Sequence, residues 1–111
     1  MSITSHCLDL YHGCPGAGMK VEIYFEKQKI NSVTLNKDGR SDQALVESKD
    51  VKTGNWEIKF FLADYYKTKI KLNEPPFLNE VVIKFGVSNA KDKYHIPLLC
   101  TPHSYTTYRG S

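Results

Sequence analysis

The sequence contains little arginine and little net charge. Fifteen of its 111 residues are lysine or arginine, and the arginines are only two, Arg40 and Arg109. Twelve acidic residues leave a formal net charge of +3. Proteins that bind nucleic acid concentrate positive charge against the phosphates, and a net charge of +3 over this length does not indicate such a surface. No nucleic-acid partner is predicted.

Long hydrophobic runs and targeting signals are also missing. No apolar run approaches the roughly 20 residues that a membrane-spanning helix needs, so no membrane association is predicted. The first residues, Met1-Ser2-Ile3-Thr4-Ser5-His6, lack the charged and apolar regions of a secretory signal. A cytoplasmic location is the expectation, with the periplasm as the alternative if a signal peptide has been removed.

Cysteine is scarce and does not follow a metal-binding or disulfide pattern. The three cysteines, Cys7, Cys14 and Cys100, are odd in number and have no C-x-x-C spacing, so we expect buried free thiols. The half-sites His12-x-Cys14 and Cys100-x-x-His103 match no closed zinc spacing. No glycine-rich phosphate loop and no nucleophilic serine or cysteine motif is present. Neither a metal nor a cofactor is predicted.

Alternation of apolar and polar residues dominates what remains. The clearest runs are Met19 to Glu26, Trp56 to Phe60 and Val81 to Val87, and further strands are expected at 2–10, 32–35, 94–100 and 104–108. One segment, about Leu62 to Ile70, has helical spacing instead and predicts one short helix. The length suits a single domain, 1–111. The pattern therefore predicts an all-β fold, an antiparallel β-sandwich of seven or eight strands.

Two of the four histidines lie within expected strands. His6 and His95 each occupy a strand position, and by alternation His95 points away from the core. A single strand histidine is usually a surface or structural residue, but two that face a common site would suit proton transfer near neutral pH. His12 and His103 fall in or beside expected turns, so we expect them to be solvated.

Arg40 and the C-terminus are the other candidates. Arg40 follows a tight Asp38-Gly39 turn, and in a chain that otherwise uses lysine it suggests a need for a planar, multidentate donor. The ending Tyr108-Arg109-Gly110-Ser111 brings together an aromatic ring, a guanidinium and a terminal carboxylate. The plainer alternatives are a solvated arginine and a frayed edge strand.

Three blocks of the sequence together carry a family resemblance. They are Ser5-His6-Cys7-Leu8-Asp9 with Gly13-x-Pro15, then Thr34-Leu35-Asn36-Lys37-Asp38-Gly39-Arg40, and finally Tyr94-His95-Ile96-Pro97-Leu98-Leu99 with Tyr108-Arg109-Gly110-Ser111. The chain resembles the transthyretin-like family over essentially its whole length, and within it the branch that hydrolyses 5-hydroxyisourate. The departures from the family pattern avoid the residues that the family uses for chemistry; they are Ser5, Cys7, Gly16, Cys100 and His103.

The resemblance implies an eight-stranded transthyretin-like sandwich that assembles as a homotetramer, a dimer of dimers, with active sites in the channel between dimers. It implies ring-opening hydrolysis of 5-hydroxyisourate, the product of urate oxidation, in purine catabolism toward allantoin, with no cofactor. The catalytic residues would be His6, Arg40, His95 and Ser111, and the substrate would contact His6, Arg40 and Tyr108. Either histidine could be the general base, and Arg109 is expected to fix the tail.

Two other functions fit the same fold. A carrier of small hormone-like ligands, as transthyretin is, shares the architecture, although such a carrier lacks this combination of two histidines, an arginine and the Tyr-Arg-Gly-Ser ending. A non-catalytic interaction module that uses its exposed strand edges is the third reading. It leaves the C-terminal tetrapeptide without a role. Because fold alone does not determine function, the choice depends on the candidate site residues, and these favour the hydrolase.

Overall fold

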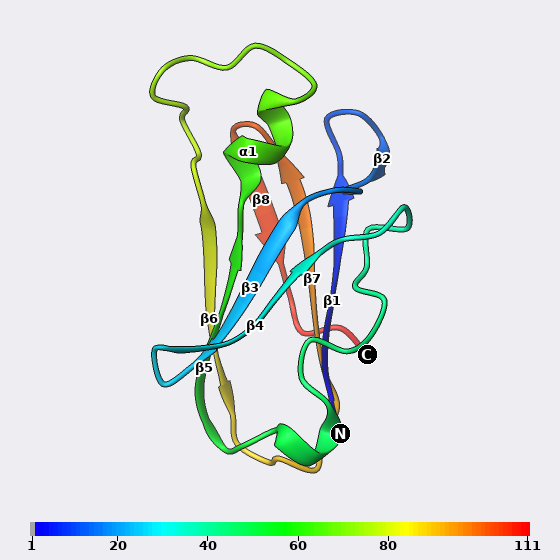
Figure 1. Cartoon of the computed structure of the whole chain (residues 1–111), viewed down its shortest axis with the longest axis vertical. Coiled ribbons are helices and arrows are strands. Elements are labelled where there is room, and N and C mark those ends of the chain that lie inside the picture. Colours follow the sequence, from blue (N-terminus) through cyan, green and yellow to red (C-terminus); the bar gives the residue numbers. More distant parts are fainter. Residues whose placement is uncertain (1) are drawn as a thin grey trace.

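The structure, a computed structural model, describes residues 2–111. Its strands form two four-stranded sheets (Figure 1). One sheet has the order β2-β1-β7-β8, with β1 at Ile3–Asp9, β2 at Cys14–Pro15, β7 at Tyr94–Thr101 and β8 at Ser104–Thr107. The other has the order β4-β3-β5-β6, with β3 at Lys20–Phe25, β4 at Gln28–Thr34, β5 at Gly54–Phe60 and β6 at Val81–Val87. A short 3-10 turn lies at Ser48–Asp50, and one helix, α1, at Leu62–Lys67. The predicted eight-stranded sandwich with one helix is confirmed.

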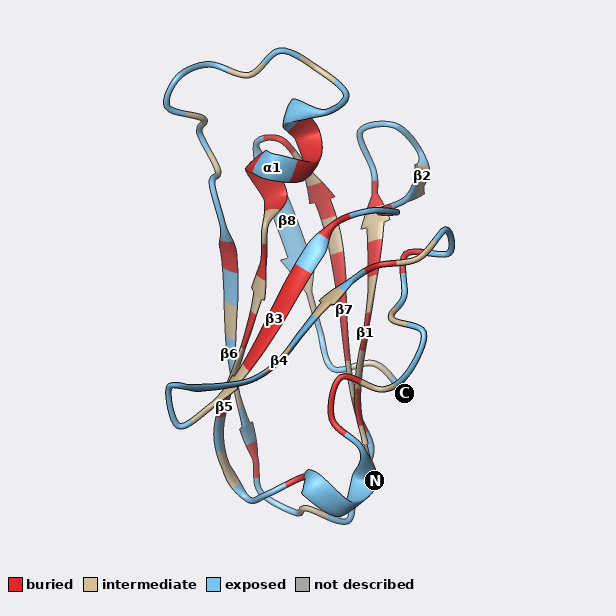
Figure 2. Ribbon diagram, viewed as in Figure 1, coloured by how far each residue is buried: buried red, intermediate tan, exposed pale blue. Residues whose placement is uncertain are grey.

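The core lies between the two sheets, where the buried residues gather along the strands (Figure 2). In β5, Trp56, Ile58 and Phe60 are buried while the residues between them are half-exposed. Strand β1 alternates in the same way along its whole length. Because a strand's side chains point to opposite faces in turn, burying one face leaves the other face of each sheet at the surface.

Three local features differ from the sequence prediction. Strand β1 pairs with β7 in parallel, whereas every other strand pair is antiparallel. The helix ends at Lys67, short of Ile70, because the Thr68 hydroxyl bonds to the Tyr65 carbonyl and the chain then turns away. Strand β4 begins at Gln28, four residues earlier than expected, after a tight hairpin at residues 26 and 27, where both residues have positive φ. That hairpin has none of the usual glycine or asparagine signals.

A buried carboxylate attaches α1 to the end of β1. Asp9 is fully buried and accepts hydrogen bonds of 2.7 Å from the hydroxyls of Tyr65 and Tyr66 and from His12 Nδ1. Burial by itself would raise the pKa of Asp9, but the hydrogen bonds from Tyr66, His12 and Tyr65 outweigh it and lower the pKa. His12 is exposed, as expected from its place beside a turn, and its ring also bonds to Asp9, a contact that the sequence did not reveal.

The cysteines behave as small apolar side chains. All three are free, and Cys7 and Cys100 are fully buried with their sulfur atoms 3.7 Å apart, while Cys14 is half-buried. Within residues 2–111, no group of three or more histidine, cysteine or acidic side chains is placed to hold a metal ion. No helix of the described chain has the length and apolar character to cross a membrane.

Candidate functional site

Both strand histidines lie on the outer face of the sheet that contains β1 and β7. His6 and His95 are half-exposed, and each alternates with buried neighbours in its strand. The parallel register pairs Thr4 with His95 and His6 with Pro97, so the two histidines are diagonal neighbours. Diagonal neighbours on adjacent strands lie about 7–8 Å apart at Cα. The two histidines therefore lie close together on one face of the sheet.

The turn before Arg40 is built by Asn36. Its backbone carbonyl accepts a hydrogen bond from Gly39 N at 2.9 Å. Its side-chain Oδ1 accepts hydrogen bonds from the backbone N–H groups of Asp38 and Arg40, at 2.9 and 3.2 Å. An asparagine side chain that bonds its own backbone two residues on is a recognised turn-forming device. The turn therefore holds the Arg40 backbone in a fixed position.

Gly39 docks this turn on β1. Its carbonyl accepts a hydrogen bond of 2.9 Å from Cys7 N, and its φ is +73°. A Cβ atom at this position would lie 2.4 Å from the Cys7 carbonyl oxygen, so no residue larger than glycine fits. The contact continues as an antiparallel bridge between His6 and Arg40. The arginine is thereby placed beside the first histidine.

The C-terminal tail closes against the second histidine. Gly110 N donates a hydrogen bond of 2.7 Å to the His95 carbonyl, and a Cβ on Gly110 would lie 2.7 Å from His95 Cδ2. Arg109 packs away from the histidines: its guanidinium lies 4.3 Å from the centre of the Tyr94 ring and donates to the Lys93 carbonyl at 3.2 Å. These contacts agree with a role for Arg109 in fixing the tail.

One partner of the site had no signal in the sequence analysis. Thr4 Oγ1 lies 2.8 Å from His95 Nδ1. Threonine is neither ionisable nor part of a recognised catalytic motif here, and only the parallel pairing of β1 with β7 brings it to the ring. Its position two residues before His6 would have placed it on the same face, but not opposite His95.

The electrostatic environment keeps both imidazole rings neutral. Burial lowers the pKa of His6, and the nearby Arg40 charge lowers it further. Burial also lowers the pKa of His95, with smaller contributions from Arg40, His6 and Lys93. The Arg40 charge thus acts on both rings, in keeping with the backbone bridge between Arg40 and His6. A neutral imidazole beside a guanidinium can accept a proton from a substrate or from water.

Two predicted site residues are not in contact with this group. Tyr108 is 58% exposed, and Ser111 is also exposed. Within residues 2–111 neither makes a hydrogen bond to His6, Arg40 or His95. The structure therefore brings together His6, Arg40, His95 and the tail at Gly110, while Tyr108 and Ser111 extend from that tail into solvent.

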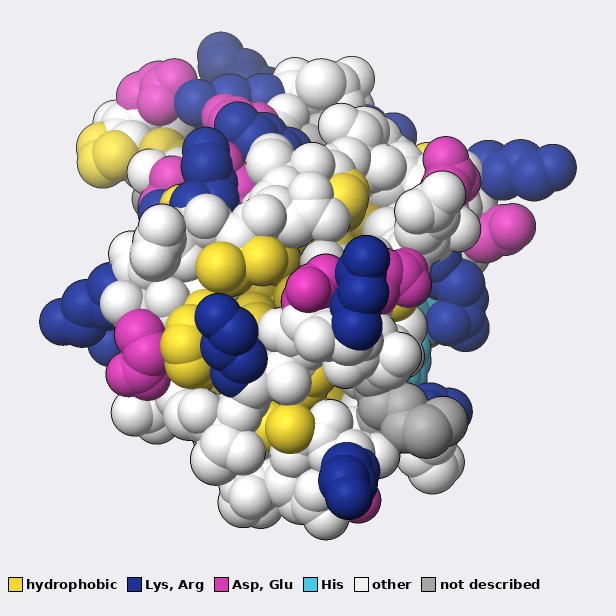
Figure 3. Space-filling view, turned by 60° about the horizontal axis from the view of Figure 1, so that its bottom comes forward, with side chains coloured by type: hydrophobic (Ala, Val, Ile, Leu, Met, Phe, Trp, Pro, Cys, Tyr) yellow, Lys and Arg dark blue, Asp and Glu magenta, His cyan; other side chains and the backbone are white. Residues whose placement is uncertain are grey.

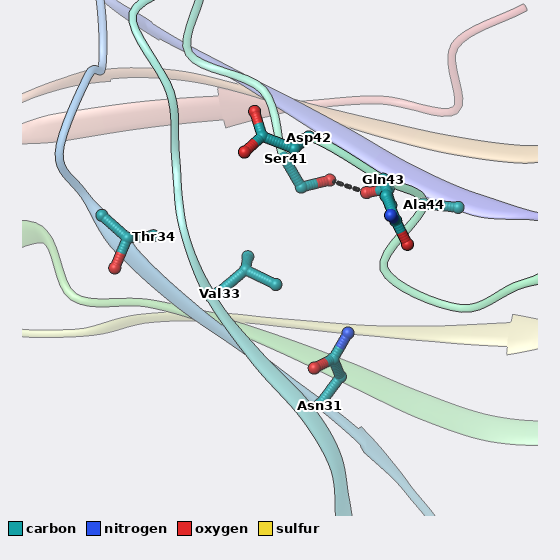
Figure 4. A pocket seen from close by; sticks show the side chains of 7 residues that line it. All are labelled: Asn31, Val33, Thr34, Ser41, Asp42, Gln43 and Ala44. Carbon is teal, nitrogen blue, oxygen red and sulfur yellow. Dashed lines mark hydrogen bonds between the residues drawn. The ribbon is translucent and has the colours of Figure 1, made fainter.

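Two hollows of the surface are lined by the segment 41–44, and neither is lined by His6 or His95. A hollow of about 340 Å³ lies between β4 and the segment 41–44 (Figure 4) and is lined by Asn31, Val33, Thr34, Ser41, Asp42, Gln43 and Ala44. A smaller one, about 170 Å³, lies on the other side of the same segment and is lined in part by Thr4 and Arg40. The chemistry favours the smaller hollow, since the larger one contains no residue of the histidine–arginine group.

The charged side chains are interspersed on the face seen in Figure 3, where lysine, arginine and acidic groups alternate around small apolar patches. A histidine is visible at the right-hand edge of that view, beside positive side chains. His6 and His95 are half-exposed, so the site lies at the surface of the chain. A substrate bound there would remain in contact with water unless another surface covered it.

Comparisons with known proteins find relatives over almost the whole chain. A family model described as the HIUase/Transthyretin family matches residues 3–110. A "5-hydroxyisourate hydrolase" of Pseudomonas aeruginosa is 45% identical over 114 residues, covering 98% of this chain and 90% of that protein.

Two solved structures are similar in fold. A crystal structure of (S)-allantoin synthase superimposes with a TM-score of 0.93 at 32% identity, covering 99% of this chain and 43% of that one. Sea bream transthyretin in complex with thyroxine has a TM-score of 0.88 at 18% identity, covering 99% of this chain and 95% of that one. At 18% identity the second likeness concerns the fold alone.

Proposed function

The chain belongs to the HIUase/Transthyretin family, and from this membership we propose that it hydrolyses 5-hydroxyisourate at a site made of His6, Arg40 and His95. The observation that carries the proposal is the convergence of these three side chains from three separate segments on one sheet face. The relative from Pseudomonas aeruginosa, which is named "5-hydroxyisourate hydrolase", supports the choice of substrate. The reaction would serve the degradation of urate toward allantoin.

The reaction needs a base and a means of stabilising negative charge. Water adds to the carbonyl carbon of the ring amide and forms a C–O bond while its proton passes to a base. The tetrahedral oxyanion then collapses, the C–N bond breaks, and the departing nitrogen takes up a proton. His6 or His95 fits the role of base, since the lowered pKa of both rings leaves them neutral at neutral pH.

Arg40 fits the role of charge stabiliser and substrate clamp. Its guanidinium is planar and carries several donors in a fixed geometry, which suits a flat, hydrogen-bonding heterocycle better than a lysine would. The Asn36 turn and the contact of Gly39 with Cys7 hold the Arg40 backbone in advance. Donors that need no rearrangement are the ones that lower the barrier most.

The tail and a second copy of the chain would complete the site. We place Tyr108 as a substrate contact and Ser111 as a residue that orients water or a histidine, both in a homotetramer whose sites lie in the channel between dimers. The exposure of His6 and His95 supports such an assembly, because a substrate bound at the surface of one chain can be buried against a second subunit. A hormone-type carrier shares the fold but gives no reason for two neutral histidines beside an arginine.

Freshly generated 5-hydroxyisourate, followed by its ultraviolet decay, tests the proposal. The wild-type protein should accelerate the decay well above buffer, and His95→Ala should lose roughly 10²–10⁴-fold in kcat. His103→Ala is the matched control, since His103 is exposed and lies outside the site; it should keep wild-type rates. Absence of acceleration by a folded wild-type protein would refute the proposal.

A further inference from the structure

Thr4 contacts the His95 ring directly. The two residues are 91 positions apart in the sequence, yet Thr4 Oγ1 lies 2.8 Å from His95 Nδ1 in a half-buried environment. The contact follows from the backbone, because the parallel register of β1 and β7 pairs Thr4 with His95. Thr4 is therefore a fixed neighbour of this ring and not a chance contact between mobile surface groups.

The ring is also restrained on a second side. The close approach of Gly110 to Cδ2, where a Cβ would come within 2.7 Å, covers one edge of the imidazole. Nδ1 is occupied by Thr4. Nε2 is consequently the ring nitrogen that remains for a substrate or a water molecule.

The position of the single ring proton then matters. Burial and the positive groups around His95 lower the pKa of the ring, so it is neutral near pH 7 and carries one N–H. The positive charge of Arg40 is one cause of that lowering. A threonine hydroxyl can accept a hydrogen bond as well as donate one, so it can receive the N–H at Nδ1.

We propose that Thr4 is a positioning residue whose hydroxyl accepts the Nδ1–H of His95 and so holds the Nε2 lone pair toward the substrate. The group that engages one ring nitrogen decides what the other nitrogen can do, as the carboxylate of a serine-protease triad does for its histidine. This assigns the general-base role to His95 rather than to His6. The assignment of a base rests on the proposed hydrolase function, whereas the tautomer does not.

Nitrogen-15 NMR of the histidine rings tests the tautomer without any substrate. Long-range proton–nitrogen spectra, recorded where the ring is neutral, should show His95 protonated at Nδ1 in the wild-type protein. Valine has no acceptor for that N–H, so Thr4→Val should shift the population to the form protonated at Nε2. A wild-type ring protonated at Nε2, or a Thr4→Val ring with an unchanged tautomer, would overturn the inference.

Kinetics provide the second arm. Thr4→Val should lower kcat/KM roughly tenfold, by loss of one hydrogen bond to a half-buried group, with most of the loss in kcat, and Thr4→Ser should restore it to within about twofold. Thr101→Val is the matched control: the Thr101 hydroxyl also makes a side-chain hydrogen bond from β7, at 2.8 Å to the Ser104 hydroxyl, but at the opposite end of the strand from His95. Its kcat/KM should stay near the wild-type value.

The two arms separate the possible failures. A protein without hydrolase activity but with the expected tautomer shift would refute the proposed function and leave the Thr4 contact established. An active protein in which Thr4→Val retains wild-type kcat/KM would refute the positioning role of Thr4.

Discussion

Replacing Gly110 with alanine tests whether the tail sets the position of His95. The new Cβ would lie 2.7 Å from Cδ2 and 3.3 Å from Cγ of the ring, whereas carbon atoms pack at about 3.5–4.0 Å. Either the ring rotates, at about 0.5–1.5 kcal/mol for a 30° departure from its rotamer, or the tail lifts and loses the 2.7 Å hydrogen bond from Gly110 N to the His95 carbonyl. That bond contributes about 0.5–1.5 kcal/mol.

Both responses displace a reacting group while the fold persists. A shift near 1 Å at a catalytic centre costs on the order of 10²-fold in rate, so we expect Gly110→Ala to lower kcat/KM by roughly 10- to 100-fold. The free energy of unfolding should fall by no more than about 1.5 kcal/mol, because only one terminal hydrogen bond is at risk. Steady-state decay of 5-hydroxyisourate and urea denaturation measure the two quantities.

Gly86→Ala is the matched control for this substitution. Gly86 lies in β6, and a Cβ there would have no neighbour within 4 Å. This variant should match the wild-type protein in kcat/KM. A Gly110→Ala enzyme that retains kcat/KM within twofold of wild type would refute the idea that the tail positions the ring.

Four other outcomes are expected. Arg40→Lys keeps the charge but loses the planar donor, so kcat/KM should fall about 100-fold with unfolding unchanged; near-wild-type kinetics would remove Arg40 from the site. Because the pKa values of His6 and His95 are lowered, the acid limb of the kcat/KM profile should lie below pH 6.5, and a limb above 6.5 would contradict this. The free energy of unfolding should fall as the pH drops below 6.5, because the unfolded chain then binds more protons than the folded one. Asp9→Asn should destabilise the fold by about 3 kcal/mol in urea denaturation, since one carboxylate oxygen loses its donors. Residues added after Ser111 should slow turnover at least about tenfold without altering the melting temperature; an unchanged rate would argue against a role for the tail at Ser111.

The sequence was sufficient for those features that depend on local pattern. Alternation identified strands such as β5, because burying Trp56, Ile58 and Phe60 on one face requires a period of two. The turn before Arg40 was evident from Asp38-Gly39, since the tight backbone there needs glycine. These signals lie within a few residues of the feature that they predict.

Features that depend on distant pairing were not predictable in this way. The parallel partnership of β1 with β7 joins residues some 90 positions apart, and nothing in either strand specifies direction. The contact of Thr4 with His95 follows from that pairing, and the attachment of α1 to Asp9 likewise joins residues 56 positions apart. The hairpin at residues 26 and 27 was missed for a different reason, because its positive φ angles occur at Glu and Lys and not at glycine.

The geometry of the site depends on the packing of the core beneath it. A slip of one residue between β1 and β7 would turn every side chain to the opposite face, which would bury His6 and expose Cys7. The packing of the buried face opposes this slip. The Cys7 sulfur contacts the Cys100 sulfur, and a Cβ on Gly16 would come within 2.8 Å of the same Cys7 sulfur. The small thiol therefore fits a space that fixes the register, and the register in turn sets the offset between His6 and His95.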